Sequence, residues 1–234
     1  MNRFETIKAE LHKMLGPDIG IGVTDPKASG AALLSGEIPA MKRAVETRRL
    51  EFAAGRSAAR QAMRKLNLNP VAIPMADDRS PVWPDGVIGS ITHCNDICIA
   101  IVAHKGSEHG IGIDIEPYGP LDPDLEAVIC TPSEREWLDT QNAERRRHLA
   151  KQIFCVKESI YKAIHPLIGQ MIEFQDVEFL RPLQPNSPIA LTIGDRTTRL
   201  ELRLMSQILG DKFFSFAALD NMSAMSLLRL ESVS

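Results

Sequence analysis

The pattern of apolar and polar positions along the chain predicts two long helices. In the segment 41–66, apolar residues recur at 45, 52, 59, 63 and 66 and fall on one helical stripe. A second stripe, at 149, 153, 156, 160 and 164, predicts a helix over about 143–164. We expect Pro166 and Gly169 to end that helix.

Shorter apolar runs predict the strands. Two of them, 87–92 and 97–103, are separated by a polar tetrapeptide, which indicates a hairpin. Residues 110–117 read GIGIDIEP, in which isoleucine alternates with Gly, Asp or Glu, the period typical of a strand. Thr131 and Glu134 around Pro132 have the spacing of a helical capping box. Later strands are expected at 173–180, 189–193, 199–204 and 213–219.

These elements predict an α+β fold made of two similar halves, because each half reads as a strand, a long helix and further strands. Residues 106–110, GSEHG, give the best internal boundary, so we expect an N-terminal half at 1–106 and a C-terminal half at 107–234. A faint echo between IGIGVTDP at 19–26 and the strand at 110–117 agrees with a repeat.

Composition then narrows the classes of protein. The 234 residues are 44% hydrophobic, enough for a core without disulfide or metal staples. With 27 Lys and Arg against 30 Asp and Glu, the charge is too even for nucleic-acid binding by bulk charge. The longest apolar run, 97–103, is too short to span a membrane, and the first residues interleave charges where a signal peptide is apolar. Four cysteines without a CxxC pair indicate reduced thiols, so we expect a cytoplasmic protein.

Paired acids on the strand at 110–117 form the first candidate site. Strand alternation places Asp114 and Glu116 on one face, about 7 Å apart. Two such carboxylates repel each other unless a cation lies between them, and Mg²⁺ prefers ligands of this kind. The alternative is an ordinary strand whose polar face meets water.

The second long helix carries a third acid. Glu158 lies opposite the core stripe but is flanked there by Phe154 and Tyr161, so we expect it to be partly withdrawn from water. Lys162, four residues later, or a metal can neutralise it, and Lys157 and Lys162 can both reach an anion bound nearby. The alternative is an exposed Glu and Lys pair on an amphipathic helix.

Basic residues on the first long helix suggest an anion site. Arg56 lies inside the apolar stripe, and Arg48, Arg49 and Arg60 lie at its edges, so a phosphate-rich ligand is one partner for them. An internal ion pair or a snorkelling Arg56 is the alternative. His93, which follows Thr92 at a strand end, can donate to phosphate, or can be a structural histidine.

Several enzyme classes lose their main support. The chain has no GxxxxGK phosphate loop, no GxSxG elbow and no HExxH helix. A zinc site from His93, Cys94 and Cys98 is disfavoured, because adjacent residues point apart and no second ligand pair follows.

Three blocks in this order, SITHCNDICIAIVA, GIGIDIE and FCVKESIYKAI, resemble the 4′-phosphopantetheinyl transferase superfamily and its Sfp-like branch. The preceding RRLEFAAGRSAAR and RSPVWPDGVIGSITH are similar to the siderophore-synthase group, of which enterobactin synthase component D is the namesake. The resemblance implies two similar α/β halves with the active site in the cleft between them. It also implies transfer of phosphopantetheine from coenzyme A to a serine of an apo carrier protein (peptidyl, aryl or acyl), with release of adenosine 3′,5′-bisphosphate.

The resemblance also implies residue roles. Asp114, Glu116 and Glu158 would hold Mg²⁺, or alternatively Mn²⁺. Glu158, directly or through a metal-bound water, would be the base for the incoming serine. Lys162, Lys157 and His93 would contact the phosphates, and Arg48 and Arg56 the region of the 3′-phosphate. Arg79 would replace a basic contact that some relatives have at the position of Met75, and Thr92 is expected among the residues that bind coenzyme A.

Two other functions are retained as alternatives. A metal-dependent phosphodiester or nucleotide hydrolase would use similar carboxylates and arginines, with water as acceptor. A non-catalytic module that binds carrier proteins is disfavoured, because a docking surface does not need buried carboxylates. Since one chain contains both halves, we expect a monomer.

Overall fold

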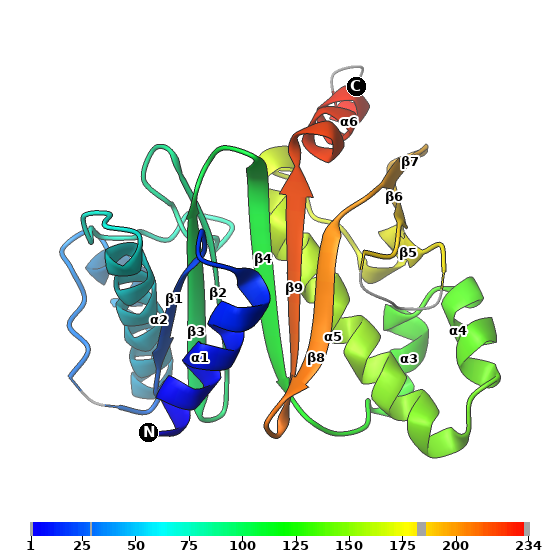
Figure 1. Cartoon of the computed structure of the whole chain (residues 1–234), viewed down its shortest axis with the longest axis horizontal. Helices are drawn as coiled ribbons and strands as arrows, with labels where there is room; N and C mark the ends of the chain where they lie inside the picture. The colour runs from blue at the N-terminus through cyan, green and yellow to red at the C-terminus, as the bar shows by residue number, and fades with distance from the viewer. Residues whose placement is uncertain (1, 29, 182–185, 232–234) are drawn as a thin grey trace. The chain divides into compact units, whose positions relative to one another are not determined.

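The computed structural model describes residues 2–28, 30–181 and 186–231, and the chain divides into two compact units, Met1–Gly106 and Ser107–Ser234. The N-terminal unit contains α1 (Arg3–Leu15), β1 (Gly20–Thr24), the 3-10 helix η1 (Ile38–Met41), α2 (Glu46–Lys65), β2 (Val87–Cys94) and β3 (Ile97–His104). Its three strands form an antiparallel sheet in the order β1-β3-β2, and α2 packs along β1 and β3 (Figure 1).

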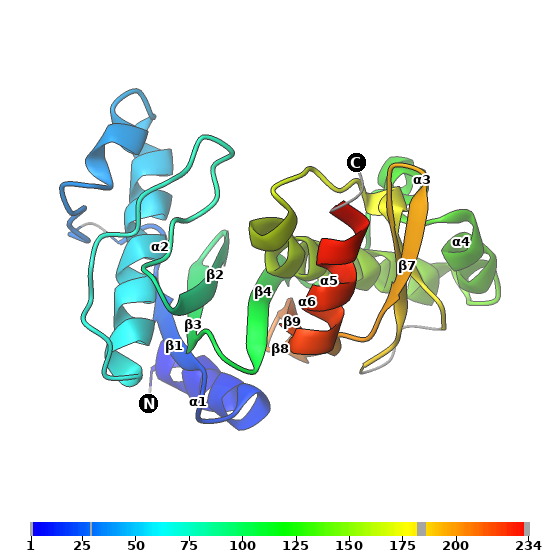
Figure 2. The same cartoon turned by 90° about the horizontal axis from the view of Figure 1, so that it is seen from above.

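The C-terminal unit begins with β4 (Glu108–Pro117), α3 (Pro123–Ile129), α4 (Pro132–Asp139) and α5 (Ala143–Ile168). After η2 (Phe174–Asp176) come β5 (Val177–Phe179), β6 (Ile189–Ile193), β7 (Arg196–Leu200), β8 (Arg203–Leu209), β9 (Lys212–Asp220) and α6 (Asn221–Glu231). The antiparallel sheet β4-β9-β8 is crossed on one face by α5, and a small second sheet has the order β5-β6-β7 (Figures 1 and 2).

Most of the expected elements are present. The hairpin, the strand at 110–117 and both long helices are confirmed, as is the capping box, in which Thr131 and Glu134 each accept from the other's backbone N–H. The mixture of helices and antiparallel sheets confirms the α+β class.

Several boundaries were wrong. Gly169 ends α5 in the left-handed conformation, as expected, but Pro166 does not end it and lies inside its last turn, so the helix continues to Ile168. The expected strand at 173–180 is only the short β5 after η2, and the run 199–204 is divided between β7 and β8. The helices α1, α3 and α6 were not expected. Among the described residues, no helix has the length and apolar character that crossing a bilayer requires.

Two glycines in β4 bring the strand against the backbone of α5. A Cβ built on Gly110 would lie 2.0 Å from the carbonyl oxygen of Ala163, and one on Gly112 would lie 1.9 Å from that of Ser159. The same contact occurs in the N-terminal unit, where Gly20 and Gly22 of β1 lie against the carbonyls of Ala62 and Ala58 of α2. Both units are therefore built on one motif, a glycine-bearing strand under a long helix. This shared packing accounts for the sequence similarity between residues 19–26 and 110–117.

We expect Gly112→Ala to destabilise the chain by about 3 kcal/mol, because the new methyl group would overlap the Ser159 carbonyl and force α5 away from β4. Urea unfolding followed by circular dichroism measures the loss. Gly106→Ala is the control, since a Cβ there meets nothing within 4 Å. Equal stability of the two variants would contradict the close approach.

Candidate functional site

The acidic strand face lies beneath α5 and does not face water. Gly110, Gly112, Asp114 and Glu116 alternate along β4, so all four share the face that the two glycines open to the helix. Asp114 is only 4% exposed. The alternative of an ordinary solvent-facing strand is therefore wrong for this face, and the buried carboxylate of Asp114 requires a cation or hydrogen-bond donors.

Lys162 supplies that cation and links the strand to the helix acid. Its Nζ donates to Oδ1 of Asp114 at 2.6 Å and lies 3.8 Å from Oε2 of Glu158. Burial disfavours the charged ammonium, but the two carboxylates outweigh it, so the pKa of Lys162 is raised. The structure thus brings Asp114, Glu158 and Lys162 together, as the spacing of four residues on α5 suggested.

A second lysine neutralises the other strand acid. Lys151 of α5 donates from Nζ to Oε2 of Glu116, and its ammonium lies 4.9 Å from the ring centroid of Phe154. Sequence reasoning did not identify Lys151. The signal was available, because Lys151 precedes Glu158 by two helical turns and so lies on the same face of α5.

The pKa of Glu158 depends on its burial and on three of these charges. Burial raises the pKa of its carboxyl group, the nearby carboxylates of Asp114 and Glu116 raise it further, and Lys162 opposes them. The three acids are close enough to repel one another, and such repulsion favours a bound cation.

The donor chemistry of these acids fits a magnesium or manganese ion, which takes carboxylate oxygens and completes its shell with water or phosphate. In the ion-free chain, however, lysines occupy two of the three carboxylates. Within the described ranges, no group of three or more His, Cys, Asp or Glu side chains is arranged as a metal site. Binding an ion would therefore require Lys151 and Lys162 to give way.

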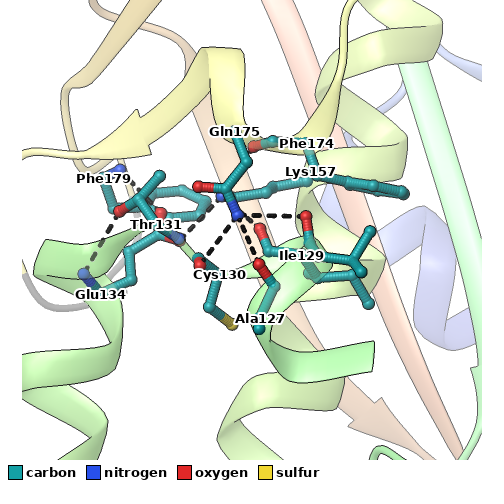
Figure 3. A network of polar contacts seen from close by, with 10 residues as sticks. Ala127, Ile129, Cys130, Thr131, Glu134, Lys157, Phe174, Gln175 and Phe179 are labelled. Carbon is teal, nitrogen blue, oxygen red and sulfur yellow. Dashed lines mark hydrogen bonds and ion pairs between the residues drawn. The ribbon is translucent and has the colours of Figure 1, made fainter. Parts of the chain in front are cut away.

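Lys157 does not join this cluster, and we correct its expected role. Its side chain is buried, and Nζ donates to Oε2 of Glu134 at 2.7 Å and to the carbonyls of Ile129 and Phe174 at 2.9 Å each (Figure 3). An ammonium group has three donors, so none is left for a phosphate. Burial also lowers the pKa of Lys157, against the attraction of Glu134.

Glu134 is the centre of this internal network. Besides Lys157, its carboxylate accepts from the backbone N–H groups of Thr131 at 2.9 Å and Phe179 at 3.0 Å. Gln175 adds hydrogen bonds from its side-chain amide to the carbonyls of Ala127, Val128 and Cys130 (Figure 3). These bonds join the α3–α4 connection, β5 and the helix that carries Glu158, so the network is structural.

In the N-terminal unit, the buried Arg56 is held by backbone carbonyls. Its Nε donates to Ile73 O at 2.9 Å and its Nη2 to Pro74 O at 3.4 Å, and its guanidinium lies 3.9 Å from the centroid of the Phe52 ring. Burial lowers its pKa to about 10, an effect that Glu37 opposes and nearby Arg48 strengthens. These contacts orient the guanidinium and use only part of its donors.

Arg48 and His93 meet near this arginine. Nη1 of Arg48 lies 3.4 Å from Nε2 of His93 and 3.5 Å from Oε2 of Glu51. Arg60 is different, because it makes a buried ion pair with Glu37 at 2.6 Å. The alternative of an internal ion pair thus describes Arg60, whereas Arg48 and His93 remain partly exposed.

The two remaining candidates differ in exposure. Thr92 is buried in β2, one residue before His93. Arg79 lies at a positive φ of 72° in an exposed turn, where its N–H donates to Ala76 O. The structure describes these residues within the N-terminal unit and the carboxylates within the C-terminal unit.

Comparison with known proteins identifies the family. A family model described as the 4′-phosphopantetheinyl transferase N-terminal domain matches residues 37–103, and that of the 4′-phosphopantetheinyl transferase superfamily matches residues 110–212. The 4′-phosphopantetheinyl transferase Npt of Nocardia iowensis is 39% identical over 165 residues, which cover 70% of this chain and 72% of the relative. The chain belongs to the 4′-phosphopantetheinyl transferase superfamily.

Other members of the superfamily are similar over shorter segments. Svp of Streptomyces mobaraensis is 41% identical over 66% of this chain and 64% of its own length. Enterobactin synthase component D of Salmonella typhimurium is 36% identical over 53% of this chain and 51% of its own length. This similarity confirms the resemblance to the siderophore-synthase group. The chain is thus an enzyme of the transferase class, with one matched segment in each unit.

We expect Lys157→Met to cost about 3 to 5 kcal/mol of stability, because it leaves the buried Glu134 carboxylate without its counter-ion. The free energy of unfolding in urea is the measurement. Arg199→Met is the control, because it breaks an exposed ion pair with Glu201 and should cost less than about 1 kcal/mol. Similar small losses for both variants would contradict the structural role.

Proposed function

We propose that the chain transfers the 4′-phosphopantetheine group of coenzyme A to a serine hydroxyl of an apo carrier protein, with release of adenosine 3′,5′-bisphosphate. Family membership supports the transfer. The observation that carries the assignment of residues is the Lys162 ammonium shared by Asp114 and Glu158, with Glu116 near enough to raise the pKa of Glu158.

In this proposal Asp114, Glu116 and Glu158 are the ligands of Mg²⁺, with Mn²⁺ as an alternative. The bound ion would neutralise charge on the diphosphate of coenzyme A. Lys162 already lies among these carboxylates, so a phosphate oxygen that approaches them meets an ammonium group as well.

The chain's own groups then account for the transfer. The serine oxygen attacks the phosphorus that bears pantetheine, and the bond from this phosphorus to the bridging oxygen breaks, so the bridging oxygen leaves with adenosine 3′,5′-bisphosphate. Glu158 accepts the serine proton as the general base. Lys162 offsets negative charge on the departing side.

Residues of the N-terminal unit complete the proposed coenzyme A contacts. Arg56, oriented by two backbone carbonyls, and Arg48 would bind the 3′-phosphate. His93 would donate to a phosphate, with Thr92 and Arg79 as further contacts. Lys157 is no longer included, because its donors are occupied inside the chain.

The carrier would belong to siderophore, non-ribosomal peptide or polyketide synthesis. This rests on the similarity to proteins named enterobactin synthase component D. A monomeric, cytoplasmic enzyme is part of the same proposal, and the four free cysteines agree with a reducing compartment.

Glu158→Gln tests the proposed chemistry. The wild-type chain is incubated with coenzyme A, Mg²⁺ and apo carriers of siderophore, polyketide and fatty-acid origin, and each carrier is weighed by mass spectrometry. We expect the mass of one phosphopantetheine group to be added, and the variant to be slower by about a hundredfold or more, since a base and ion ligand is lost. Coenzyme A binding should remain.

Glu144→Gln is the matched control, because Glu144 is exposed at the start of the same helix. Normal transfer by Glu158→Gln would remove Glu158 from the mechanism. Transfer that continues after Mg²⁺ has been chelated would contradict the proposed role of the ion. Free phosphopantetheine without a modified carrier would indicate the hydrolase.

Arg56→Ala tests the contact with the 3′-phosphate. We expect coenzyme A to bind about tenfold to a hundredfold more weakly, the usual effect of losing a hydrogen bond to a charged group. Binding of 3′-dephospho-coenzyme A should change little, and calorimetry measures both. Arg64→Ala, at an exposed position of α2, is the control. An equal loss for the two ligands would contradict the assigned contact.

A further inference from the structure

The acids Asp114, Glu116 and Glu158 form, with Lys151 and Lys162, what we call the acidic cluster. Neither the sequence motifs nor the proposed chemistry assigns a role to Lys151. It makes an ion pair with Glu116, and both side chains are largely withdrawn from water, at 17% and 25% exposure. The exposed pair of Arg199 and Glu201, by contrast, has side chains exposed by 60% and 76%. A pair as sheltered as that of Lys151 is less screened by solvent.

The ammonium group of Lys151 is also held from a second side. It lies 4.9 Å from the ring centroid of Phe154, and this ring packs against Phe174 at 5.5 Å between centroids. Attraction between a cation and an aromatic face adds to the ion pair. Lys151 therefore has a defined place beside Glu116, supported by two different kinds of contact.

We propose that Lys151 is a positioning residue that neutralises Glu116 in the metal-free enzyme and thereby lowers the affinity of the acidic cluster for its divalent cation. This inference rests on the proposed ligand role of Glu116. The Oε2 atom that accepts from Lys151 is an oxygen that an ion would take. Binding an ion at Glu116 must therefore displace this ammonium group or act against its positive charge.

The proposal predicts an effect opposite to that of ordinary structural damage. Lys151→Met removes a competing cation but keeps a side chain of similar length over Phe154. The variant should bind Mn²⁺ about fivefold to tenfold more tightly than the wild-type chain, a change that corresponds to one partly buried ion pair. Lys151→Arg, which retains the charge, should bind Mn²⁺ as the wild-type chain does.

The experiment titrates the full-length, metal-free chain with Mn²⁺ in the absence of coenzyme A and carrier, and measures free Mn²⁺ by electron paramagnetic resonance. Lys105→Met is the control for net charge, because Lys105 is exposed in the other unit. Lys151→Met is also tested in a chain that carries Glu116→Gln, where it should no longer increase the affinity for Mn²⁺. Circular dichroism verifies folding, and Lys151→Gln replaces Lys151→Met if the latter does not fold.

Each outcome bears on a particular claim. Unchanged or weaker Mn²⁺ binding by the neutral Lys151 variants would overturn the inference while the proposed ion site remains. Equal tightening in the Glu116→Gln background would overturn it too, because the effect would not pass through Glu116. A wild-type chain that binds no Mn²⁺ would instead overturn the ion site of the proposed function, and this inference with it.

Discussion

The close approach of the β4 and α5 backbones is the constraint on which the acidic cluster depends. Only a residue without a Cβ fits at Gly112, where that atom would lie 1.9 Å from the Ser159 carbonyl oxygen. Because the helix lies so near, Asp114, two residues further along the same strand face, is buried. Glu158, directly before Ser159, then shares Lys162 with it. Burial and mutual repulsion give these acids a chemistry that solvent-exposed carboxylates would not have.

The N-terminal unit has the same close approach of strand and helix, but a different buried cation. Gly22 lies against Ala58 as Gly112 lies against Ser159, so Arg56 occupies the helix position equivalent to that of Lys157. Both are buried cations that donate to backbone carbonyls of neighbouring segments. The difference is Glu134, which completes the bonding of Lys157. The hydrogen bonds described for Arg56 are all to carbonyls, which is why we propose that its charge is available to an anion.

How much the sequence could predict follows from which interactions are local. The alternation at 110–117 and the spacing of Glu158 and Lys162 depend on the periods of strand and helix, and both were readable. Lys157 was misassigned because its partner Glu134 is 23 residues away and becomes a neighbour only when α4 packs on α5. Helix geometry already argued against the assignment, since Lys157 is adjacent to Glu158 and therefore points about 100° away from it. The short helices α1, α3 and α6 depend on tertiary packing that no local period shows.

The lysines of the cluster also explain how the carboxylates of the proposed cation site can lie close together in a stable ion-free chain. Three neighbouring carboxylates, one of them buried, would oppose folding, and Lys162 and Lys151 offset that cost through their ion pairs. The same ion pairs compete with any metal. In the proposed function, a cation that binds these carboxylates would leave the ammonium groups of Lys162 and Lys151 without their partners, and the diphosphate of coenzyme A would supply new ones. Cation and coenzyme A should then each favour the other's binding, because each relieves the charge that the other leaves unpaired.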